Sequence, residues 1–306
     1  MRRKAIPCVR RHKFEAILFE VAGFARTRMG GLRATILPVG SMLCQSSGGL
    51  LGKYDEFPAT DASARSTLGS ARDDRLRASF GHVTTWVFDL DNTLYPPDSG
   101  IWPKINERIT LFLIDLFGLD GQSARALHRY YYMQHGTTLR GLIEENIDAA
   151  ERFLEFVHDI DRSALKPDPV LAREVARLRG RKLIFTNGSR DHAILTARQL
   201  GLDGLFEDAF DIVAASLTPK PAEAAYRAFC DRYDVDPRQA AMFEDVAKNL
   251  AVPKAKGMTT VLVTAKPGQV DHRELQDRAG TEGAAAVDYI TNDLGQFLAR
   301  LNAGLA

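Results

Sequence analysis

Residues 87–95 read Val87-Phe88-Asp89-Leu90-Asp91-Asn92-Thr93-Leu94-Tyr95, an apolar run that passes directly into a pair of acids. The run from residue 85 to residue 90 predicts a buried strand, and the chain leaves the sheet where Asp89 and Asp91 stand. Two carboxylates that point into one crevice repel each other, and their burial without a cation is costly. The segment therefore indicates a divalent-cation site, for which oxygen ligands favour Mg²⁺. Taken alone, the segment also fits an acidic turn after a strand.

From residue 84 onwards, apolar runs typical of strands alternate with helical patterns. The predicted strands cover residues 85–90, 182–186, 211–214, 240–244 and 259–263, with a weak one near Tyr289. The predicted helices between them cover residues 169–178, 193–200, 222–233 and 246–254. Several strands are continuous apolar runs, which favours a parallel sheet covered on both faces. The fold class that we expect is therefore α/β, a doubly wound parallel sheet with a site at the carboxyl ends of its strands.

A long segment between the first two predicted strands contains only helical patterns. Residues 101–116 place apolar side chains on one helical face, and further helices are predicted at residues 123–134, 139–147 and 149–156. We expect an α-helical cap inserted above the sheet. The predicted domains are thus a core made of residues 83–98 and 168–306, and a cap made of residues 99–167.

The first 82 residues differ in composition from the rest of the chain. They are rich in Arg and Lys up to Lys13, and Gly and Ser clusters follow, for example at residues 46–49. Only residues 14–24 carry enough apolar side chains for a short helix, so we expect a disordered and dispensable extension. An Arg-rich targeting peptide and a functional basic arm are the alternatives.

The overall composition excludes several classes of protein. The 306 residues carry a formal net charge of +1, so a nucleic acid polymer is not an expected partner. The three cysteines, Cys8, Cys44 and Cys230, form no metal-binding spacing, and their scatter favours a reducing compartment, which we take to be the cytoplasm. No apolar run reaches the ~18 residues that a membrane span needs. Nothing in the sequence predicts the oligomeric state.

Two further strand ends carry groups suited to an anion. Thr186 ends the second predicted strand, and Asn187 and a glycine come next, so hydroxyl and backbone N–H groups could hold an anion there. The plain alternative is a helix N-cap. After the third predicted strand, Lys220 stands between Pro219 and Pro221, which hold it stiffly enough to act as a fixed charge for a phosphoryl group. The alternative is a solvated loop lysine.

The fourth predicted strand ends in a second acid pair. Glu244 and Asp245 also place two carboxylates side by side, as Asp89 and Asp91 do, and these repel each other. One cation can neutralise both acid pairs. Asn249 follows Asp245 by four residues, one helical turn, so it could orient that carboxylate. Four strand ends that carry acids, hydroxyl, lysine and acids in this order predict one phosphoryl-transfer site.

The order Asp-x-Asp-x-Thr, Thr-Asn, Lys, Glu-Asp resembles the four motifs of the haloacid dehalogenase superfamily of phosphohydrolases. The resemblance covers the chain from about residue 84 to its end. Residues 89–97, 136–142, 157–161 and 243–250 further resemble the pyrimidine 5′-nucleotidase branch, which removes phosphate from UMP and CMP. The resemblance implies a phosphomonoesterase with Mg²⁺ as cofactor and a small phosphomonoester as substrate. Members of that branch with other substrates, lysophosphatidate among them, leave the substrate open.

The resemblance also implies a role for each matching residue. Asp89 would attack phosphorus and form an aspartyl phosphate, and Asp91 would protonate the leaving group and then activate water. For that pair to work, Asp91 should be protonated while Asp89 is ionised. Thr186 and Asn187 would bind phosphoryl oxygens, and Lys220 would neutralise charge. Asp89, the Asp91 backbone carbonyl, Asp245 and, directly or through water, Glu244 would hold Mg²⁺.

The leaving group would be selected by the cap. Thr138 and Arg140, in the segment Gly136-Thr137-Thr138-Leu139-Arg140, are the predicted substrate-binding residues. The tyrosines at 130–132 and His135 are further candidates, although tyrosines at helical spacing also serve as packing. His158 and Asp159 stand where the cap rejoins the core, as a hinge or as ligands.

Other functions remain open at this point. A dehalogenase would use Asp89 without a metal, which Asp91 and the acid pair at 244–245 argue against. A phosphatase for sugar phosphates and a sugar phosphomutase would use the same residues. A catalytically silent regulator that binds a nucleotide is the alternative outside enzymes.

Overall fold

The computed structural model describes residues 73–270 and 283–303. The chain divides into two compact units, Met1–Leu68 and Gly69–Ala306, and the described residues all belong to the second unit. Most of the extension expected to be disordered therefore lies outside the described residues. Within the described part, no helix combines the length and the apolar character needed to cross a lipid bilayer.

A six-stranded parallel sheet forms the centre of this unit, in the order β3-β2-β1-β4-β5-β6. The strands are β1 (Thr85–Phe88), β2 (Arg181–Phe185), β3 (Asp208–Phe210), β4 (Ala240–Glu244), β5 (Thr259–Val263) and β6 (Tyr289–Thr291). Val87 of β1 lies in register with Leu183 of β2 on one side and Met242 of β4 on the other. The strand order reverses at β1, and ligands bind outside the carboxyl ends of open α/β sheets at such a point.

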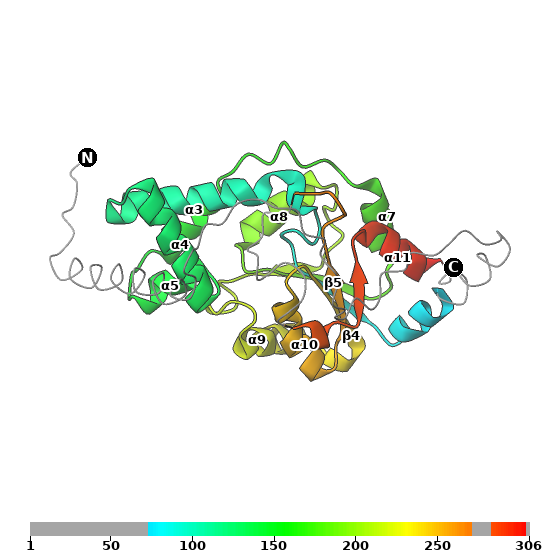
Figure 1. The fold of residues 1–306 in the computed structure, drawn as a ribbon. Coiled ribbons are helices and arrows are strands. Elements are labelled where there is room, and N and C mark those ends of the chain that lie inside the picture. Colours follow the sequence, from blue (N-terminus) through cyan, green and yellow to red (C-terminus); the bar gives the residue numbers. More distant parts are fainter. Residues whose placement is uncertain (1–72, 271–282, 304–306) are drawn as a thin grey trace, which may run out of the picture. The chain divides into compact units, whose positions relative to one another are not determined.

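Helices cover both faces of the sheet, which confirms the predicted fold class. They are α7 (Pro169–Arg177), α8 (Arg190–Gln199), α9 (Glu223–Tyr233), α10 (Ala251–Lys256) and α11 (Leu294–Asn302). Figure 1 shows α7 beside α11 on one face, and α9 with α10 on the other. Val87 packs with Phe229 of α9, whereas Phe88 stacks on Phe243, which contacts Phe297 of α11. Alternate residues of β1 thus face opposite layers, as strand geometry requires.

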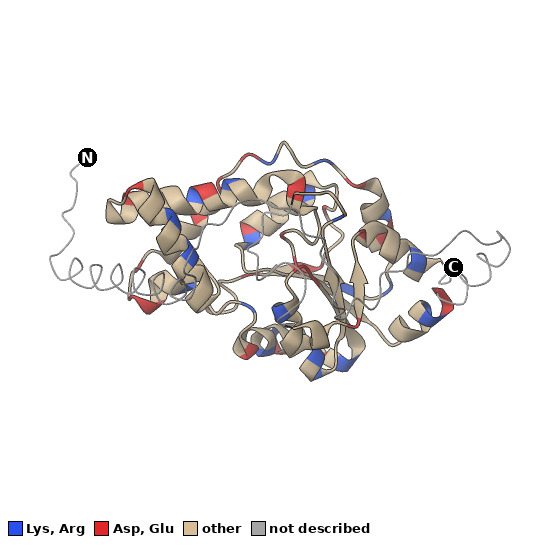
Figure 2. Cartoon of the chain, viewed as in Figure 1, with Lys and Arg blue, Asp and Glu red and all other residues tan. Residues whose placement is uncertain are grey.

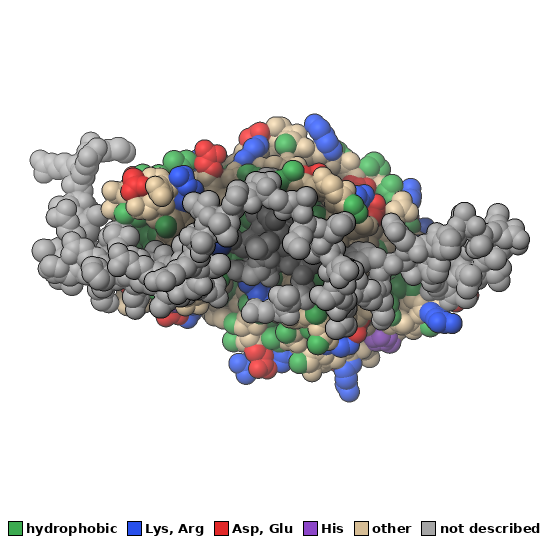
Figure 3. All heavy atoms as spheres, viewed as in Figure 1, with side chains coloured by type: hydrophobic (Ala, Val, Ile, Leu, Met, Phe, Trp, Pro, Cys, Tyr) green, Lys and Arg blue, Asp and Glu red, His purple; other side chains and the backbone are tan. Residues whose placement is uncertain are grey.

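The helical insert follows β1 and a short 3₁₀ turn, Pro97–Ser99. It consists of α3 (Ile101–Phe117), α4 (Gly121–His135), α5 (Thr138–Glu144) and α6 (Ala150–His158), within a few residues of the predicted helices. Its packing is close where α4 meets α5, because a Cβ at Gly141 would lie 2.3 Å from the ring of Tyr131. Charges of both signs are interspersed along the described helices and over the face shown (Figures 2 and 3), in keeping with the net charge of +1.

Two predicted elements were wrong in position. The third strand, predicted at residues 211–214, is β3 at Asp208–Phe210, because both carboxylate oxygens of Asp211 accept backbone N–H bonds, from Arg190 and Ala214, and hold that apolar segment as a turn. The helix predicted at residues 246–254 is a 3₁₀ segment, Ala247–Leu250, followed by α10. Pro253 has no N–H and is tolerated only in the first turn of an α-helix, so α10 begins at residue 251.

The ordered core also begins earlier than the predicted boundary at residue 83. Residues 73–80 are helical, and Leu76 and Phe80 on one side of that helix are buried. The ring of Phe80 stacks on Trp86 with 6.0 Å between centroids and meets Phe297 edge-on at 5.9 Å. The last part of the presumed extension therefore packs against the sheet and α11.

Candidate active site

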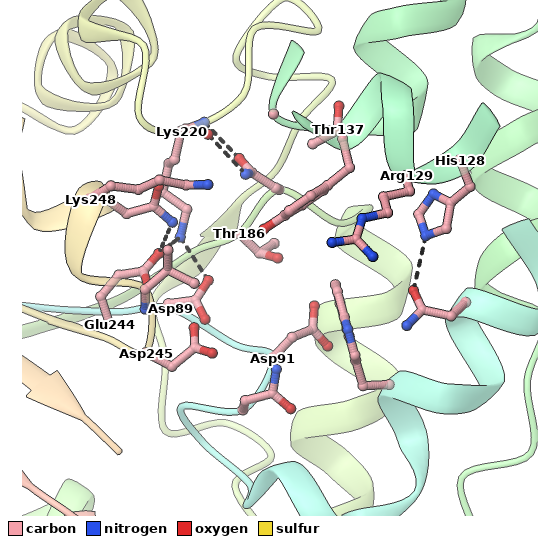
Figure 4. A pocket seen from close by; sticks show the side chains of 18 residues that line it. Asp89, Asp91, His128, Arg129, Thr137, Thr186, Lys220, Glu244, Asp245 and Lys248 are labelled. Atoms are coloured by element: carbon pink, nitrogen blue, oxygen red, sulfur yellow. Dashed lines mark hydrogen bonds and ion pairs between the residues drawn. The ribbon is translucent and has the colours of Figure 1, made fainter. Parts of the chain in front are cut away.

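An open cavity lies between the carboxyl ends of the central strands and the helical insert (Figure 4). Its volume is about 880 Å³, which includes open space at its mouth. Three adjacent strands position polar groups on its floor, since Asp89 follows β1, Thr186 follows β2 and Glu244 ends β4. The backbone extends the ladder by one step, because Asp89 N donates to Phe243 O at 2.9 Å. Residues far apart in sequence thus meet at one edge of the sheet.

A buried lysine joins the acids of two strands. Lys220 Nζ lies 2.7 Å from Asp89 Oδ1 and 2.8 Å from both Glu244 Oε1 and the backbone oxygen of Phe185. Burial disfavours its charge, but the two carboxylates outweigh burial and raise the pKa of Lys220 above its usual range. The side chain is 2% exposed, so its positive charge is held in the floor of the cavity. The alternative of a solvated loop lysine is therefore wrong.

The loop that carries Lys220 is held by Asn187. The backbone N–H of Lys220 donates to Asn187 Oδ1 at 2.8 Å, and Asn187 Nδ2 donates to Lys220 O at 3.3 Å. Thr186 is almost fully buried, and its hydroxyl accepts the N–H of Gly188 at 2.9 Å. Both residues line the cavity, and their second partners fix their orientation toward it.

Three carboxylates gather on the same side of the cavity. Ligand atoms of Asp89, Glu244 and Asp245 all lie within 4.8 Å of one another. All three residues are buried, and such a set of hard oxygen donors suits a divalent cation of the Mg²⁺ type. The residues therefore fit the cofactor that the sequence predicted.

Asn249 supports a different acid from the one that we expected. Its Nδ2 donates to Glu244 Oε1 at 2.7 Å. The reason is the 3₁₀ segment at Ala247–Leu250, which replaces the α-helical turn assumed for Asp245 and Asn249. Glu244 Oε2 in turn accepts the N–H of Val246 at 2.7 Å, so both oxygens of Glu244 already have protein donors.

The two aspartates after β1 have different surroundings. Burial raises the pKa of Asp89 to about 7, since Lys220 opposes the shift while Glu244 and Asp91 add to it. Burial also disfavours the charge of Asp91, but attraction and hydrogen bonding to His192, with a bond from Tyr95, outweigh burial and lower its pKa to about 2. The order of the two pKa values is opposite to the expected one, because His192 and Tyr95 stabilise the charge of Asp91 whereas Glu244 and Asp91 repel the charge of Asp89.

Sequence reasoning missed His192 and gave no role to Tyr95. His192 Nε2 lies 2.8 Å from Asp91 Oδ1, and the hydroxyl of Tyr95 donates to the same oxygen. His158, expected as a hinge or a ligand, stacks on His192 with 4.5 Å between centroids and bonds the Ser189 hydroxyl at 2.9 Å. A single histidine in α8, far from Asp91 in sequence, carries no signal of this contact.

The insert supplies other residues to the cavity than the two predicted ones. Thr138 is buried and bonds His128 Nδ1, and Arg140 forms an ion pair with Glu144 one turn away. Neither lines the cavity, so we do not carry forward their predicted contact with substrate. The residues of the insert that line it are Trp102, Asn106, His128, Arg129, Tyr132, Gly136 and Thr137. In Figure 4, the Arg129 side chain extends from the insert toward the floor.

Several known proteins resemble this chain. Phosphate metabolism protein 8 of Saccharomyces cerevisiae is 31% identical over 132 residues, which cover 40% of this chain and only 41% of the yeast protein. Among solved structures, the L-2-haloacid dehalogenase of Xanthobacter autotrophicus with chloropropionic acid covalently bound is 18% identical, with 73% of this chain and 100% of that chain covered and a TM-score of 0.44. A HAD phosphatase from Thermococcus onnurineus is 17% identical, covers 69% and 94% of the two chains, and has a TM-score of 0.47.

A family model also matches most of the part of the chain that the structure describes. The family model described as haloacid dehalogenase-like hydrolase matches residues 83–294. That span contains all six strands, the helical insert and every residue that lines the cavity. The chain therefore belongs to the haloacid dehalogenase-like hydrolases.

Proposed function

We propose that this hydrolase is a Mg²⁺-dependent phosphomonoesterase that works through an aspartyl phosphate on Asp89. The observation that carries the proposal is the buried ammonium group of Lys220, which contacts Asp89 and Glu244 beside the three-carboxylate cluster. A carboxylate nucleophile and a phosphoryl group are both anionic, so such a reaction needs fixed positive charge at the point of attack. A dehalogenase that acts on a haloacid would not need the additional acids.

The proposed reaction has two displacements. The Asp89 carboxylate attacks phosphorus, the ester P–O bond breaks, and Asp91 gives its proton to the leaving oxygen. Asp91 then takes a proton from water, the water oxygen attacks phosphorus, and the bond to Asp89 breaks to release inorganic phosphate. Thr186 and Asn187 bind the phosphoryl oxygens at the floor of the cavity. A phosphoryl dianion beside Asp91 would raise its pKa and so favour the acid form.

Asp89, the backbone carbonyl of Asp91 and Asp245 are the proposed ligands of the cation. Because both oxygens of Glu244 accept protein N–H groups, we place Glu244 as a ligand through water. When bound, Mg²⁺ would supply the positive charge that lowers the pKa of Asp89 and neutralises the phosphoryl group. Lys220 supplies the same kind of stabilisation from the protein.

The leaving group that we propose is a pyrimidine nucleoside, released from UMP or CMP. The insert is proposed to act as a cap domain over residues 99–167, and it brings two aromatic side chains, Trp102 and Tyr132, to the cavity together with Asn106 and Thr137. Aromatic faces can stack on a base, and amide or hydroxyl groups can bond its edge. Among the described lining residues, Val246 is the single aliphatic one, which disfavours the acyl chain of lysophosphatidate.

A phosphate-release screen of the full-length protein in Mg²⁺ tests the proposal. UMP and CMP should be hydrolysed in preference to AMP, sugar phosphates and lysophosphatidate. Preference for a purine or a sugar phosphate would overturn the pyrimidine assignment and leave the mechanism standing. Product formed only with a bisphosphate activator would instead identify a phosphomutase. No hydrolysis of any phosphoester would overturn the proposal and favour a silent regulator.

We also propose the cellular compartment in which the enzyme works. Cys230, the one cysteine in the described part of the chain, is free, in keeping with a reducing compartment. We propose the cytoplasm, with a targeting role of the N-terminal extension as the alternative. Expression of the full-length chain with a C-terminal fluorescent tag tests this, because organelle fluorescence would favour the targeting role.

A further inference from the structure

Asp91 is bound by two donors that share one of its oxygens. His192 Nε2 and the Tyr95 hydroxyl both contact Oδ1, with 2.8 Å between Nε2 and Oδ1. Burial, with Asp91 adding to it, raises the pKa of Tyr95 well above its usual range, so the hydroxyl keeps its proton and donates. No other described residue hydrogen-bonds the carboxylate, and Asp91 lines the cavity. Oδ2 is therefore the oxygen left to exchange protons with a substrate.

The tautomer of His192 follows from its second partner, Arg162. Nη2 of Arg162 lies 3.0 Å from Nδ1 of His192. A guanidinium group has donors and no acceptor, so Nδ1 must be the acceptor of this bond. The ring proton is then on Nε2, and a neutral imidazole donates its N–H to Asp91.

The surroundings of His192 hold its ring in this orientation. His192 is fully buried and stacked on His158 with 12° between the ring planes. Arg162 also donates to the backbone oxygen of His158 at 2.9 Å and that of Ile160 at 3.1 Å. Arg162 lies between α6 and α7, where the chain returns from the insert to the core. The return segment thus fixes the guanidinium, which fixes the imidazole, which fixes Asp91.

We propose that His192 is a positioning residue for Asp91, which keeps Oδ1 as an acceptor and leaves Oδ2 to carry the proton that catalysis moves. This inference rests on the proposed phosphomonoesterase function. In the first displacement the Oδ2 proton passes to the leaving oxygen as its bond to phosphorus breaks. In the second, an Oδ2 lone pair takes a proton from the attacking water. His192 keeps its Nε2 proton throughout and is neither acid nor base.

Two substrates of similar size separate this role from a structural one. Benzyl phosphate releases an alkoxide and needs an acid, whereas 4-nitrophenyl phosphate releases a stable phenolate and needs little protonation. Values of kcat/KM report the steps up to leaving-group release and therefore exclude the shared second displacement. In the full-length protein with Mg²⁺, His192→Phe should lower kcat/KM for benzyl phosphate by roughly 10²-fold. The value for 4-nitrophenyl phosphate should fall by less than about 3-fold, since general acid catalysis contributes little there.

Conservative variants complete the test. His192→Gln, which can place an N–H near Asp91, should restore most of the ratio between the two substrates, and Asp91→Asn should reproduce the selective loss. His158→Phe is the matched control, because it keeps a ring in the stack and removes no bond to Asp91. If His192→Phe does not fold, Arg162→Met should shift the ratio in the same direction and Arg162→Lys should not.

The outcomes distinguish this inference from the function on which it rests. If His192→Phe or Arg162→Met leaves the ratio of kcat/KM for the two substrates unchanged, the positioning role is overturned. The proposed phosphatase function would still stand. A wild-type protein that hydrolyses neither these two substrates nor any other phosphoester would overturn the proposed function itself.

Discussion

The ammonium nitrogen of Lys220 lies 2.7 Å from Oδ1 of Asp89, and the two residues are 131 positions apart in the chain. Lys220 is almost completely buried, so little water screens its charge. The attraction between the Lys220 ammonium group and the Asp89 carboxylate is therefore strong. Removal of the lysine should have a correspondingly large effect on the stability of the fold. Under the proposed mechanism, this contact serves both the nucleophile and the stability of the fold.

Replacement of this lysine should damage both properties. Lys220→Met leaves Asp89 and Glu244 buried without their cation, which should lower the free energy of unfolding by ~3–5 kcal/mol. Loss of the fixed charge should lower kcat/KM by roughly 10²–10³-fold. Urea unfolding and phosphate-release kinetics measure the two effects. The control is Lys254→Met, which breaks a surface ion pair with Asp288 and should cost at most ~1 kcal/mol.

The nucleophile assignment predicts a variant that is folded but inactive. Asp89→Asn keeps the shape of the side chain, and Lys220 retains its contacts with Glu244 and with the Phe185 backbone oxygen. Turnover should fall to background while the melting temperature changes little, and no acid-stable phosphoprotein should form from labelled substrate. Wild-type activity in this variant would rule out covalent catalysis by Asp89.

Removal of divalent metal should abolish activity reversibly. EDTA should stop phosphate release, and added Mg²⁺ should restore it, because the carboxylate cluster needs a cation to bind an anionic substrate. Mg²⁺ at about 100 times its Kd should also stabilise the fold by ~2.7 kcal/mol. Asp245→Asn should lose most of that thermal shift. Phosphate release that survives EDTA would overturn the Mg²⁺ dependence, and halide release from a haloacid in EDTA would favour the metal-free dehalogenase chemistry.

Asn249 allows a test of which acid it supports. Its Nδ2 donates to Glu244, so Asn249→Ala should cost ~1–3 kcal/mol by leaving a buried carboxylate oxygen with one donor fewer. Asn249→Asp should be more harmful, because a further acid would face Glu244. If Asn249 oriented Asp245 through a cation instead, the Asp variant would retain activity and Mg²⁺ binding. Melting curves and kcat/KM decide between the two.

Two arginines of the insert form a matched pair for substrate recognition. Arg129 lines the cavity, whereas Arg140 is paired with Glu144 outside it. Arg129→Ala should raise KM for UMP by about 10-fold or more, as the loss of a charged hydrogen bond implies. Arg140→Ala should change KM by less than about 2-fold, as expected where no substrate bond is lost. Equal effects of the two substitutions would contradict a contact between Arg129 and the substrate.

The sheet and its site could be predicted because local patterns decide them. The strands β1, β4 and β5 are buried apolar runs, and the acids at 89, 91, 244 and 245 follow directly from strand ends that meet in any doubly wound sheet. The superfamily part of the resemblance is confirmed by the family match. The pyrimidine branch remains a proposal.

These local sequence patterns could not predict contacts between residues that lie far apart in the chain. One partner of Asp91 is His192, 101 residues away, and no spacing rule joins them. Residues 211–214 look like a strand, but their conformation depends on bonds that Asp211 makes to Arg190 and Ala214. Arg140 and Arg129 are equally basic in sequence, but Arg129 lines the cavity whereas Arg140 pairs with Glu144.

The contact of Phe80 with Trp86 sets a practical limit on shortening the chain. A truncated protein that starts at residue 83, where the apolar strand pattern begins, would expose the faces of Trp86 and Phe297 that Phe80 covers. It would also lose the ion pair between Asp73 and Arg300, whose atoms lie 2.8 Å apart. Expression of the catalytic unit for crystallisation should therefore start upstream of residue 73, at the boundary near Gly69.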